Sequence, residues 1–245
     1  MNGSLSGDSW TAPPLVPRMA AGESSYVVVY KPPRMHTVPR LAAPEKDSPC
    51  SVLMDWVFSR FPGIAAVRGH GENQGGLLHR LDYETRGLVL IARTSEAFTA
   101  LAAQQARGEF IKEYEALSGT GEPFPGFPPR PFSGRIRYIE SAFRPYGKGQ
   151  RAVRPLPPER GGEKPLYRTE ILSCGEGPEK TGLFRLRLAR GFRHQIRCHL
   201  AWIGRPLLND PLYGGPPFPG GFLALRACAL VFTDPLTGER REYRI

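Results

Sequence analysis

The chain has 245 residues, and 40% of them are hydrophobic, which is enough to bury a sizeable core and excludes a wholly disordered protein. Its 33 lysines and arginines against 23 acidic residues give a formal charge of +10, which favours a polyanionic partner such as nucleic acid and leaves solubility as the simpler alternative. No apolar run approaches the roughly 20 residues of a membrane-spanning helix, and no secretion signal is visible, so we expect a cytoplasmic protein outside the membrane.

The N-terminal part of the sequence predicts a loose tail, one strand and one helix. Residues 1–22 are rich in Ser, Gly, Pro and Ala, which indicates a flexible tail or a surface arm. Residues 25–31 form a β-branched and aromatic run that stops at two prolines, which predicts a strand. Residues 51–61 place apolar side chains at helical spacing, with Ser51 as a candidate cap, and so predict a helix.

The next stretch predicts a strand, a charged turn and a second strand, followed by a helix. Residues 77–81 and 87–92 are the two short apolar segments beside the turn. Residues 94–107 have helical spacing of their apolar side chains, with Thr94 as the N-cap. Residues 111–117 return to the pattern of a strand.

A basic insertion is predicted at about residues 119–165, because this segment is dense in Pro, Gly and Arg and poor in long apolar runs. Between residues 130 and 168 the sequence has ten lysines and arginines against three glutamates. A loop of this length is either disordered or functional, and its charge favours contact with RNA. The alternative is a solvated basic linker.

The C-terminal part predicts three strands, one helix and a turn. Residues 166–173 and 183–189 are typical of paired strands, and the second alternates apolar residues with arginines. Residues 193–203 turn helical, with apolar side chains on one face. Residues 222–232 predict a strand, and residues 234–238 predict a turn.

Two segments place charge inside apolar surroundings. Asp82 follows one apolar segment and precedes another, so its carboxylate is expected at the edge of a core, where burial favours the neutral form unless a cation compensates. The alternative is a turn aspartate that caps its own backbone. Arg197 lies in an apolar helical stretch, where an arginine needs a partner, although a surface helix showing its polar side would also explain it.

Several ordered motifs from about Lys31 to the C-terminus resemble those of the RluA-type pseudouridine synthase family. The segment HRLDYETRGL, which contains Asp82, is similar to the family signature H-R-L-D-x-x-T-S-G-L. The other matching segments, in chain order, are Lys31-Pro32-Pro33, Lys112-Glu113-Tyr114-Glu115-Ala116, HQIRCHLAWIGRPLLNDPLYG at 194–214 and FTDPLTGE at 232–239. Motifs in this order and spacing are far more specific than any one of them alone.

The resemblance implies that Asp82 is the catalytic carboxylate, which detaches uracil from the ribose so that C5 replaces N1 in the bond to C1′. It implies that Arg197 pairs with Asp82 and keeps it ionised. It also implies that Tyr114 packs against the uracil ring and assists proton movement at C5. Because the reaction is an isomerisation, no cofactor is expected.

The same resemblance suggests which residues bind RNA. Arg80 precedes Asp82 by two, so in an extended segment both side chains share one face, and Arg80 could contact a phosphate or fill the stack that the flipped uridine leaves. The alternative is an arginine at the end of a strand that only faces water. Lys112 and Arg193 are further candidates for RNA contact. His194 and Gln195 are expected to shape the site through hydrogen bonds, although satisfaction of the local backbone is an equal alternative for both.

Seven positions depart from the family pattern and leave the subgroup, and so the RNA target, open. Arg86 stands where the pattern has Ser, Phe192-Arg193 where it has Arg-Thr, Asn209 where it has Gly and Arg226 where it has His. Arg34 and Val38 also replace a Gly and a His of the first motif. None of these changes removes a residue that the resemblance assigns to chemistry.

For the fold, the family implies an α+β architecture, a mixed and largely antiparallel sheet flanked by helices with a central active-site cleft. Residues 23–245 would form one catalytic domain, without the S4 RNA-binding domain that relatives often carry. The four cysteines form no C-x-x-C pair, and His194 and His199 do not form H-E-x-x-H, so we expect no metal. The expected partner is ribosomal or transfer RNA, bound by a monomer.

Two other functions remain possible on the sequence. The first is a non-catalytic RNA-binding protein that retains the fold, against which the presence of Asp82, Tyr114 and Arg197 argues. The second is an N-glycosidase that uses an aspartate and releases free uracil. The reaction product distinguishes the three: pseudouridine, unchanged RNA or an abasic site.

Overall fold

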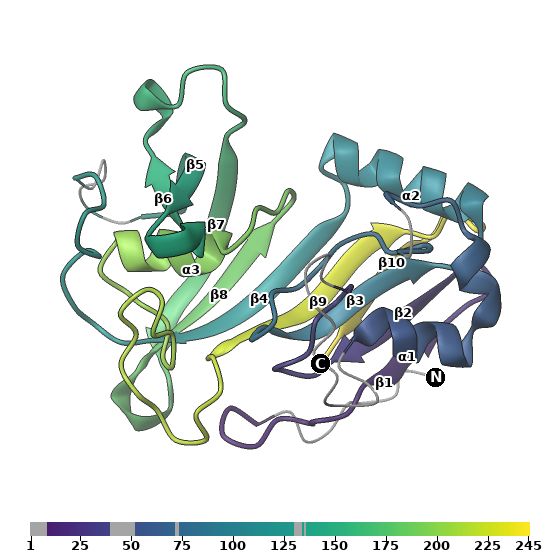
Figure 1. Cartoon of the computed structure of the whole chain (residues 1–245), viewed down its shortest axis with the longest axis horizontal. Helices are drawn as coiled ribbons and strands as arrows, with labels where there is room; N and C mark the ends of the chain where they lie inside the picture. The colour runs from purple at the N-terminus through teal and green to yellow at the C-terminus, as the bar shows by residue number, and fades with distance from the viewer. Residues whose placement is uncertain (1–8, 40–51, 72–73, 130–133, 135) are drawn as a thin grey trace. The chain divides into compact units, whose positions relative to one another are not determined.

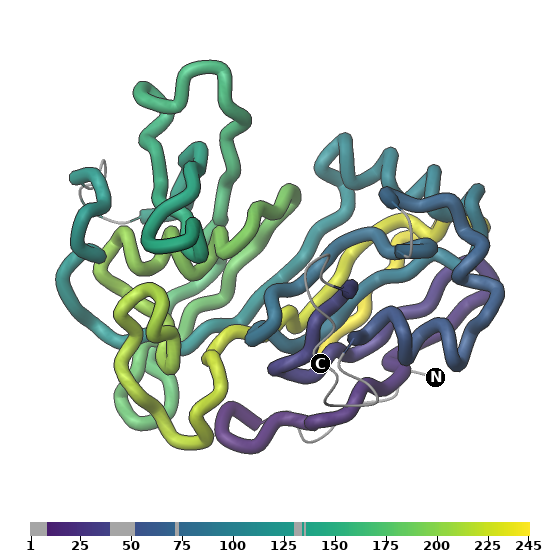
Figure 2. The backbone as a smooth tube through the Cα atoms, in the orientation of Figure 1, coloured from purple at the N-terminus to yellow at the C-terminus, as the bar shows by residue number. Residues whose placement is uncertain are grey.

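The computed structural model describes residues 9–39, 52–71, 74–129, 134 and 136–245, and the chain divides into two compact units. The first unit contains residues 1–112 and 227–245, and the second contains residues 113–226. The first unit is therefore discontinuous in sequence. Figure 2 shows its yellow C-terminal stretch running among the purple and blue segments of the first part of the chain.

The described part of the first unit contains five strands, joined in the order β1-β2-β3-β9 with β10 on β9 (Figure 1). Their bounds are β1 Arg18–Gly22, β2 Tyr26–Lys31, β3 Arg86–Ala92, β9 Leu225–Thr233 and β10 Arg240–Arg244, and β9 begins in the second unit. The pairs β1/β2, β2/β3 and β9/β10 are antiparallel. The order places β2 and β3 inside the sheet.

The central strands of this unit are buried along their whole length and, apart from Lys31 at the end of β2 and Arg86 at the start of β3, consist mostly of apolar residues. Every residue of β2 and β3 is buried, which matches the continuous Val, Leu and Ile runs of the two segments. The register runs from Tyr26 opposite Ala92 to Lys31 opposite Gly87. Gly87 has a φ of 122°, and a Cβ there would collide with the backbone of Ala227, so the position needs glycine.

Two α-helices and a short 3₁₀ turn complete the first unit: α1 Leu53–Arg60, η1 Pro62–Ala66 and α2 Ser95–Arg107. The predicted cap of the second helix is confirmed, because the Thr94 hydroxyl accepts a hydrogen bond from the Ala97 amide at 3.1 Å. Phe98 and Leu101 of α2 pack into one cluster with apolar side chains of β2, β3 and β9. The candidate cap Ser51 lies outside the described residues, and Val52 precedes α1 without a side-chain cap.

The second unit contains the strands β4 Ile111–Ser118, β5 Tyr138–Tyr146, β6 Ala152–Leu156, β7 Tyr167–Glu176 and β8 Gly182–Leu188, of which β4 begins in the first unit. Their order is β4-β8-β7-β5-β6. The pairs β5/β6, β5/β7 and β7/β8 are antiparallel. The predicted pairing of β7 with β8 is confirmed, and Phe184, Leu186 and Leu188 are buried as the alternation indicates.

The helix α3 Gln195–Trp202 is buried on all sides, together with the polar residues that it carries. Three further 3₁₀ turns of this unit are η2 Lys148–Gln150, η3 Pro158–Arg160 and η4 Pro178–Lys180. Cys198 and Ala201 of α3 pack with Phe143 of β5 and Val153 of β6. The Trp202 indole donates to the Pro128 carbonyl at 2.8 Å. The helix is thus held by both strands of the β5/β6 hairpin.

Two predictions about secondary structure are wrong, and one alternative is ruled out. Residues 18–22 form β1, which pairs with β2, so this part of residues 1–22 is not a loose tail, while residues 1–8 lie outside the described part. The insertion at 119–165, predicted as a loop, contains β5 and β6. Residues 77–81 form no strand, because only Leu77 makes an isolated bridge, to Ile91. The α+β, largely antiparallel fold with flanking helices is confirmed, and none of its described helices is long and apolar enough to cross a membrane.

Candidate active site

Asp82 lies in the connection that leads into β3, and the residues beside it are held by the segment after β2. The Thr37 hydroxyl accepts from the Leu81 amide at 3.2 Å and donates to the Leu81 carbonyl at 2.9 Å. The Tyr83 carbonyl accepts from the Met35 amide at 3.2 Å, and the Asp82 carbonyl accepts from the Thr85 amide at 3.1 Å. Hydrogen bonds on both sides therefore fix the backbone at Asp82.

Lys31, at the end of β2, supplies a buried cation beside this connection. Its Nζ donates to the carbonyls of Pro32 at 2.9 Å, Met35 at 2.8 Å and Tyr83 at 3.3 Å. Burial lowers the pKa of Lys31 to about 7, against the attraction of Asp82 and then of Glu84, which raise it. Lys31 thus links the segment after β2 to the connection that carries Asp82, through hydrogen bonds to the carbonyls of Met35 and Tyr83.

Arg86, which stands where the family pattern has Ser, is fully buried at the start of β3. Its guanidinium carbon lies 5.1 Å from the centre of the Trp10 ring, and Nη2 donates to the Ser9 carbonyl at 3.2 Å. The N-terminal arm thereby contacts the strand that begins four residues after Asp82. Part of the predicted tail is therefore tied to the start of β3.

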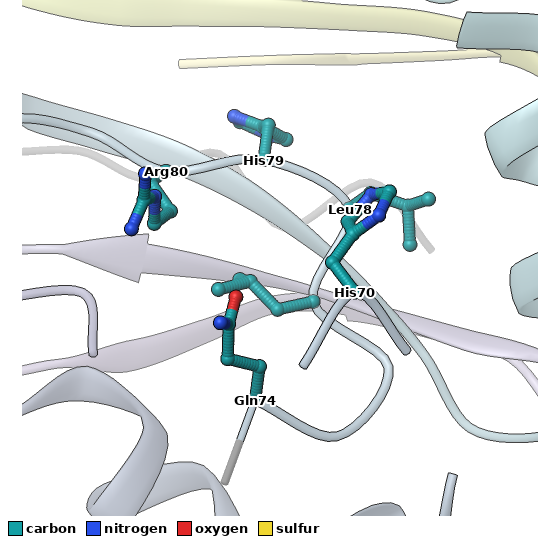
Figure 3. A pocket seen from close by; sticks show the side chains of 6 residues that line it. His70, Gln74, Leu78, His79 and Arg80 are labelled. Carbon is teal, nitrogen blue, oxygen red and sulfur yellow. The ribbon is translucent and has the colours of Figure 1, made fainter. Parts of the chain in front are cut away.

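A pocket of about 250 Å³ lies beside the same connection, lined by His70, Gln74, Leu77, Leu78, His79 and Arg80. Figure 3 shows the side chains of His70, Gln74 and Arg80 around it. The His79 ring is held in place by β3, because its Nε2 accepts a hydrogen bond from the Leu90 amide at 3.2 Å. Burial keeps the pKa of His79 well below its ordinary value. Arg80 is exposed, as a residue that contacts RNA must be.

In the second unit, Arg197 of α3 forms a buried ion pair with Asp210. Its Nε donates to Oδ2 at 2.8 Å and its Nη2 donates to Oδ1 at 2.7 Å. The side chains of Arg197 and Asp210 are 7% and 0% exposed, so the pair is shielded from water. The guanidinium carbon also lies 5.4 Å from the centre of the Tyr213 ring. These contacts fix the plane of the guanidinium group.

His194 and Gln195, which precede Arg197, form hydrogen bonds with residues of the second unit. His194 has a left-handed backbone with a φ of 56°, and its Nδ1 lies 3.2 Å from the Tyr213 hydroxyl. Burial, helped by the charges of Arg197 and Arg193, lowers the pKa of His194 to about 3, so the ring is neutral at physiological pH. Gln195 donates to the Arg168 carbonyl and the Thr169 hydroxyl.

Tyr114 and Lys112 lie on β4 and are largely buried, at 6% and 2% exposure. Successive residues of a strand point to opposite faces, so Tyr114 faces away from its neighbours Glu113 and Glu115, which bind arginines of β8 and β9. The Lys112 ammonium lies 4.9 Å from the centre of the Phe110 ring, and burial lowers its pKa to about 8. This burial favours a structural role for Lys112.

The predicted site residues are divided between the two units. The first unit holds Asp82, Arg80 and Lys112, and the second holds Tyr114, Arg193, His194, Gln195 and Arg197. Within the second unit, α3 brings Arg197 next to His194 and Gln195. The ion pair of Arg197 with Asp82 stays a prediction, and Asp210 is a partner of Arg197 that the sequence analysis missed.

Three residues of the site were missed, and a signal for each was present. Lys31 lies in the K-P motif, and Asp210 and Tyr213 lie in the segment that matches G-D-x-x-Y-G. The motifs were identified in the sequence, but the roles of these three residues depend on contacts with distant residues that only the structure shows. No cluster of three or more potential metal ligands occurs within the described residues.

Two departures from the family pattern have a clear structural explanation. Asn209 adopts a left-handed φ of 57°, which asparagine tolerates, and its side chain bonds Phe218 and Phe222 of the following loop. Arg226 makes two hydrogen bonds to Glu115, of 3.0 and 2.6 Å, which a histidine could not reproduce. Both changes stabilise the second unit and leave Arg197 in place.

Comparison with known proteins agrees with the motif series. The sequence pattern of the family described as RNA pseudouridylate synthase matches residues 25–202. "Ribosomal large subunit pseudouridine synthase D" of Escherichia coli O6:H1 is 29% identical over 219 residues, which cover 89% of this chain and 59% of the relative. The protein of the same name from Pasteurella multocida is 30% identical over 205 residues, or 78% of this chain and 56% of the relative.

Solved structures support the fold. "Human RNA Pseudouridylate Synthase Domain Containing 1" matches with a TM-score of 0.61 and 18% identity, over 94% of this chain and 83% of its own. "Human RNA Pseudouridylate Synthase Domain Containing 4" matches with a TM-score of 0.59 and 18% identity, over 93% and 87%. The chain spans less than two thirds of the length of the bacterial relatives. On the family pattern, which matches well over half of its residues, the chain belongs to the RNA pseudouridylate synthase family.

Proposed function

We propose that this chain is an RNA pseudouridine synthase that isomerises uridine in ribosomal RNA, with Asp82 as its catalytic carboxylate. The observation that carries the proposal is the buried Lys31 beside Asp82, within the signature of the family. Lys31 Nζ donates to the carbonyl of Tyr83, which follows Asp82, and attraction to Asp82 opposes the lowering of the lysine's pKa by burial. The family resemblance assigns the attack on the uridine to the carboxylate at this position.

The chemistry needs no net oxidation and no added group. The bond between N1 and C1′ breaks, the uracil rotates, and a bond forms between C5 and C1′, while C5 loses its proton and N1 gains one. Asp82 would act either as a nucleophile, bonding to the sugar or the base, or as a negative charge that stabilises the detached group. Arg197 would contribute positive charge. Tyr114 would pack against the uracil and assist the proton transfer at C5. We propose that the two units act together as one catalytic domain, with a central cleft.

The target uridine must leave its stack to reach such a site, at a cost of a few kcal/mol. Arg80 is our candidate to contact a phosphate or to fill the vacated stack, since it is exposed two residues before Asp82. The β5/β6 segment adds the exposed Arg144, Lys148, Arg151 and Arg160, which would bind phosphates and make RNA affinity fall steeply with salt. The buried Lys112 is not part of this proposal.

Ribosomal RNA is favoured over transfer RNA because the bacterial relatives carry the name ribosomal large subunit pseudouridine synthase. Such a substrate supports action in the cytoplasm, and we propose that the enzyme acts as a monomer. The runner-up is a protein of the same fold that binds RNA without modifying it.

Release of tritium tests the proposal. Ribosomal RNA transcribed with tritium at C5 of uracil loses that label to water only when C5 is joined to the sugar. We expect release with the purified chain, no release with Asp82→Asn, and normal release with Asp55→Asn, an exposed aspartate of α1. Binding without release would favour the runner-up, and abasic RNA with free uracil would indicate an N-glycosidase.

A further inference from the structure

An aromatic stack in the second unit runs from the buried core to the surface. The centres of the His199 and Phe143 rings lie 5.0 Å apart, and those of Phe143 and Phe192 lie 4.9 Å apart, with the latter two rings at an interplanar angle of only 4°. His199 is 0% exposed, Phe143 is 6% exposed and Phe192 is 37% exposed. The stack therefore ends in a large apolar ring that water reaches.

The outer ring is held firmly. Tyr167 packs against Phe192 with ring centres 5.0 Å apart, and the Phe192 amide donates to Gln195 Oε1 at 2.9 Å. Single exposed apolar side chains are common and need no function. A ring that is already fixed by Phe143 and Tyr167 differs from most of them, because little conformational entropy is lost when another flat group packs on it.

Two arginines flank this ring in the sequence. Arg190 and Arg193, on either side of Phe192 in the chain, are both exposed. The Arg193 Nη2 donates to the carbonyls of Gln150 at 2.8 Å and Ala152 at 3.1 Å, which position its charge without neutralising it. A flat apolar surface between cationic groups suits a ligand with a π face and flanking negative charges. An unstacked nucleotide within RNA is such a ligand.

We propose that Phe192 is a stacking platform for an unpaired base of the RNA substrate, with Arg190 and Arg193 at the adjacent phosphates. The inference rests on the proposed function and adds a residue that selects among RNAs. The family pattern has Arg-Thr where this chain has Phe192-Arg193, so the chain keeps an arginine in this segment and adds an aromatic ring. The platform therefore favours RNAs that present an unpaired base at this point.

The test compares side chains that keep or lose the π face at position 192. The probe is an unmodified transcript of large-subunit ribosomal RNA, bound by proteins that also carry Asp82→Asn and so hold it without turnover. Phe192→Leu keeps an apolar side chain and should weaken binding roughly 5- to 150-fold, the range measured when a base loses an aromatic partner. Phe192→Trp should bind within a few-fold of the parent, because it retains the stack.

Matched measurements separate stacking from charge and folding. The slope of affinity against salt should be the same for Phe192→Leu and its parent, since no phosphate contact is removed. Leu172→Ala removes another exposed apolar side chain of the same unit and should bind as the parent does. Thermal unfolding of each variant identifies any loss of binding that comes from misfolding.

The outcomes distinguish this inference from the proposed function. Tritium release by the wild-type chain together with unchanged binding by Phe192→Leu would overturn the platform alone, and would leave the ring free for contact with a protein. Equal losses for the Leu and Trp variants would also overturn it, because stacking would then not be the cause. If the wild-type chain neither binds the transcript nor releases tritium from it, the proposed function fails and the platform fails with it.

Discussion

Arg197 and Asp210 form a two-point ion pair within the second unit, with donor–acceptor distances of 2.8 and 2.7 Å. Asp210 is completely buried and also accepts a hydrogen bond from the Leu212 amide at 3.2 Å. The carboxylate thus joins α3 to the loop that follows it. The arginine that the family resemblance assigns to catalysis is fixed by a residue of its own unit.

The first prediction concerns this pair. Asp210→Asn removes the negative charge and leaves the Arg197 cation buried, so the free energy of unfolding should fall by about 3–5 kcal/mol. Glu140→Gln breaks the exposed pair with Arg168 and should cost no more than about 1 kcal/mol. Denaturant titration of both variants measures the difference. Equal, small losses in the free energy of unfolding of the two variants would show that Asp210 does not offset the cost of burying the Arg197 charge.

The second prediction concerns pH. Burial lowers the pKa of Lys31 to about 7 and that of Lys112 to about 8, whereas the unperturbed value is 10.5. Between these values the unfolded chain binds more protons than the folded chain, so the contribution of each lysine to stability rises with pH, by up to about 1.4 kcal/mol per pH unit. Below pH 7 neither contribution changes.

Urea titrations between pH 6.5 and pH 10 measure this slope. Lys31→Met should flatten it from about pH 7 upward, and Lys112→Met should flatten it from about pH 8 upward. Lys148→Met, which changes an exposed lysine of the η2 turn, should leave the slope unchanged. A wild-type slope that survives both buried substitutions would contradict the burial of these charges.

The third prediction concerns Asn209, whose φ of 57° is left-handed. Alanine at this position loses the side-chain hydrogen bonds and is strained, while glycine loses only the hydrogen bonds. Asn209→Ala should therefore be about 1 kcal/mol less stable than Asn209→Gly. Thermal unfolding compares the two directly, and the reverse order would mean that the backbone there is not left-handed in solution.

The fourth prediction concerns the N-terminal arm. Trp10→Leu removes the aromatic face over the buried Arg86 and should cost about 2 kcal/mol or more, because the cation is desolvated. Trp56→Leu removes a similar contact with the exposed Arg60, of 4.8 Å, and should cost roughly 0.5–1 kcal/mol. If the arm also supports the Asp82 connection, Trp10→Leu alone lowers tritium release. Equal stability of the two variants would contradict the role of Arg86 as an anchor.

Elements whose signal is local could be predicted from the sequence. The helix after Thr94 shows its cap and its apolar face within a short stretch, and both appear in the structure. The alternation of β8 likewise reports which face is buried. In contrast, β1 and β6 are edge strands of only five residues, too short to show a clear pattern, and Pro155 lies within β6, so only their partners make them strands.

The site shows the same limit. Asp82 could be assigned from the resemblance because its signature is continuous in sequence. The roles of Lys31 and Asp210 depend on distances to residues far along the chain, from Lys31 to the Tyr83 carbonyl and from Asp210 to Arg197, and no local pattern encodes them. The platform at Phe192 also needs the structure, because its neighbour Phe143 belongs to a segment that was predicted as a loop.

Mapping of pseudouridine in cellular RNA tests the central claim most directly. Ribosomal RNA from cells with and without this gene is compared, and the deletion is complemented with the wild-type chain, with Asp82→Asn or with the control Asp55→Asn. The account predicts that one or a few pseudouridines disappear on deletion, return with wild type and Asp55→Asn, and stay absent with a stably folded Asp82→Asn. Pseudouridines that return fully with Asp82→Asn would contradict the role given to this carboxylate, and a map that is unchanged by the deletion would contradict the synthase itself.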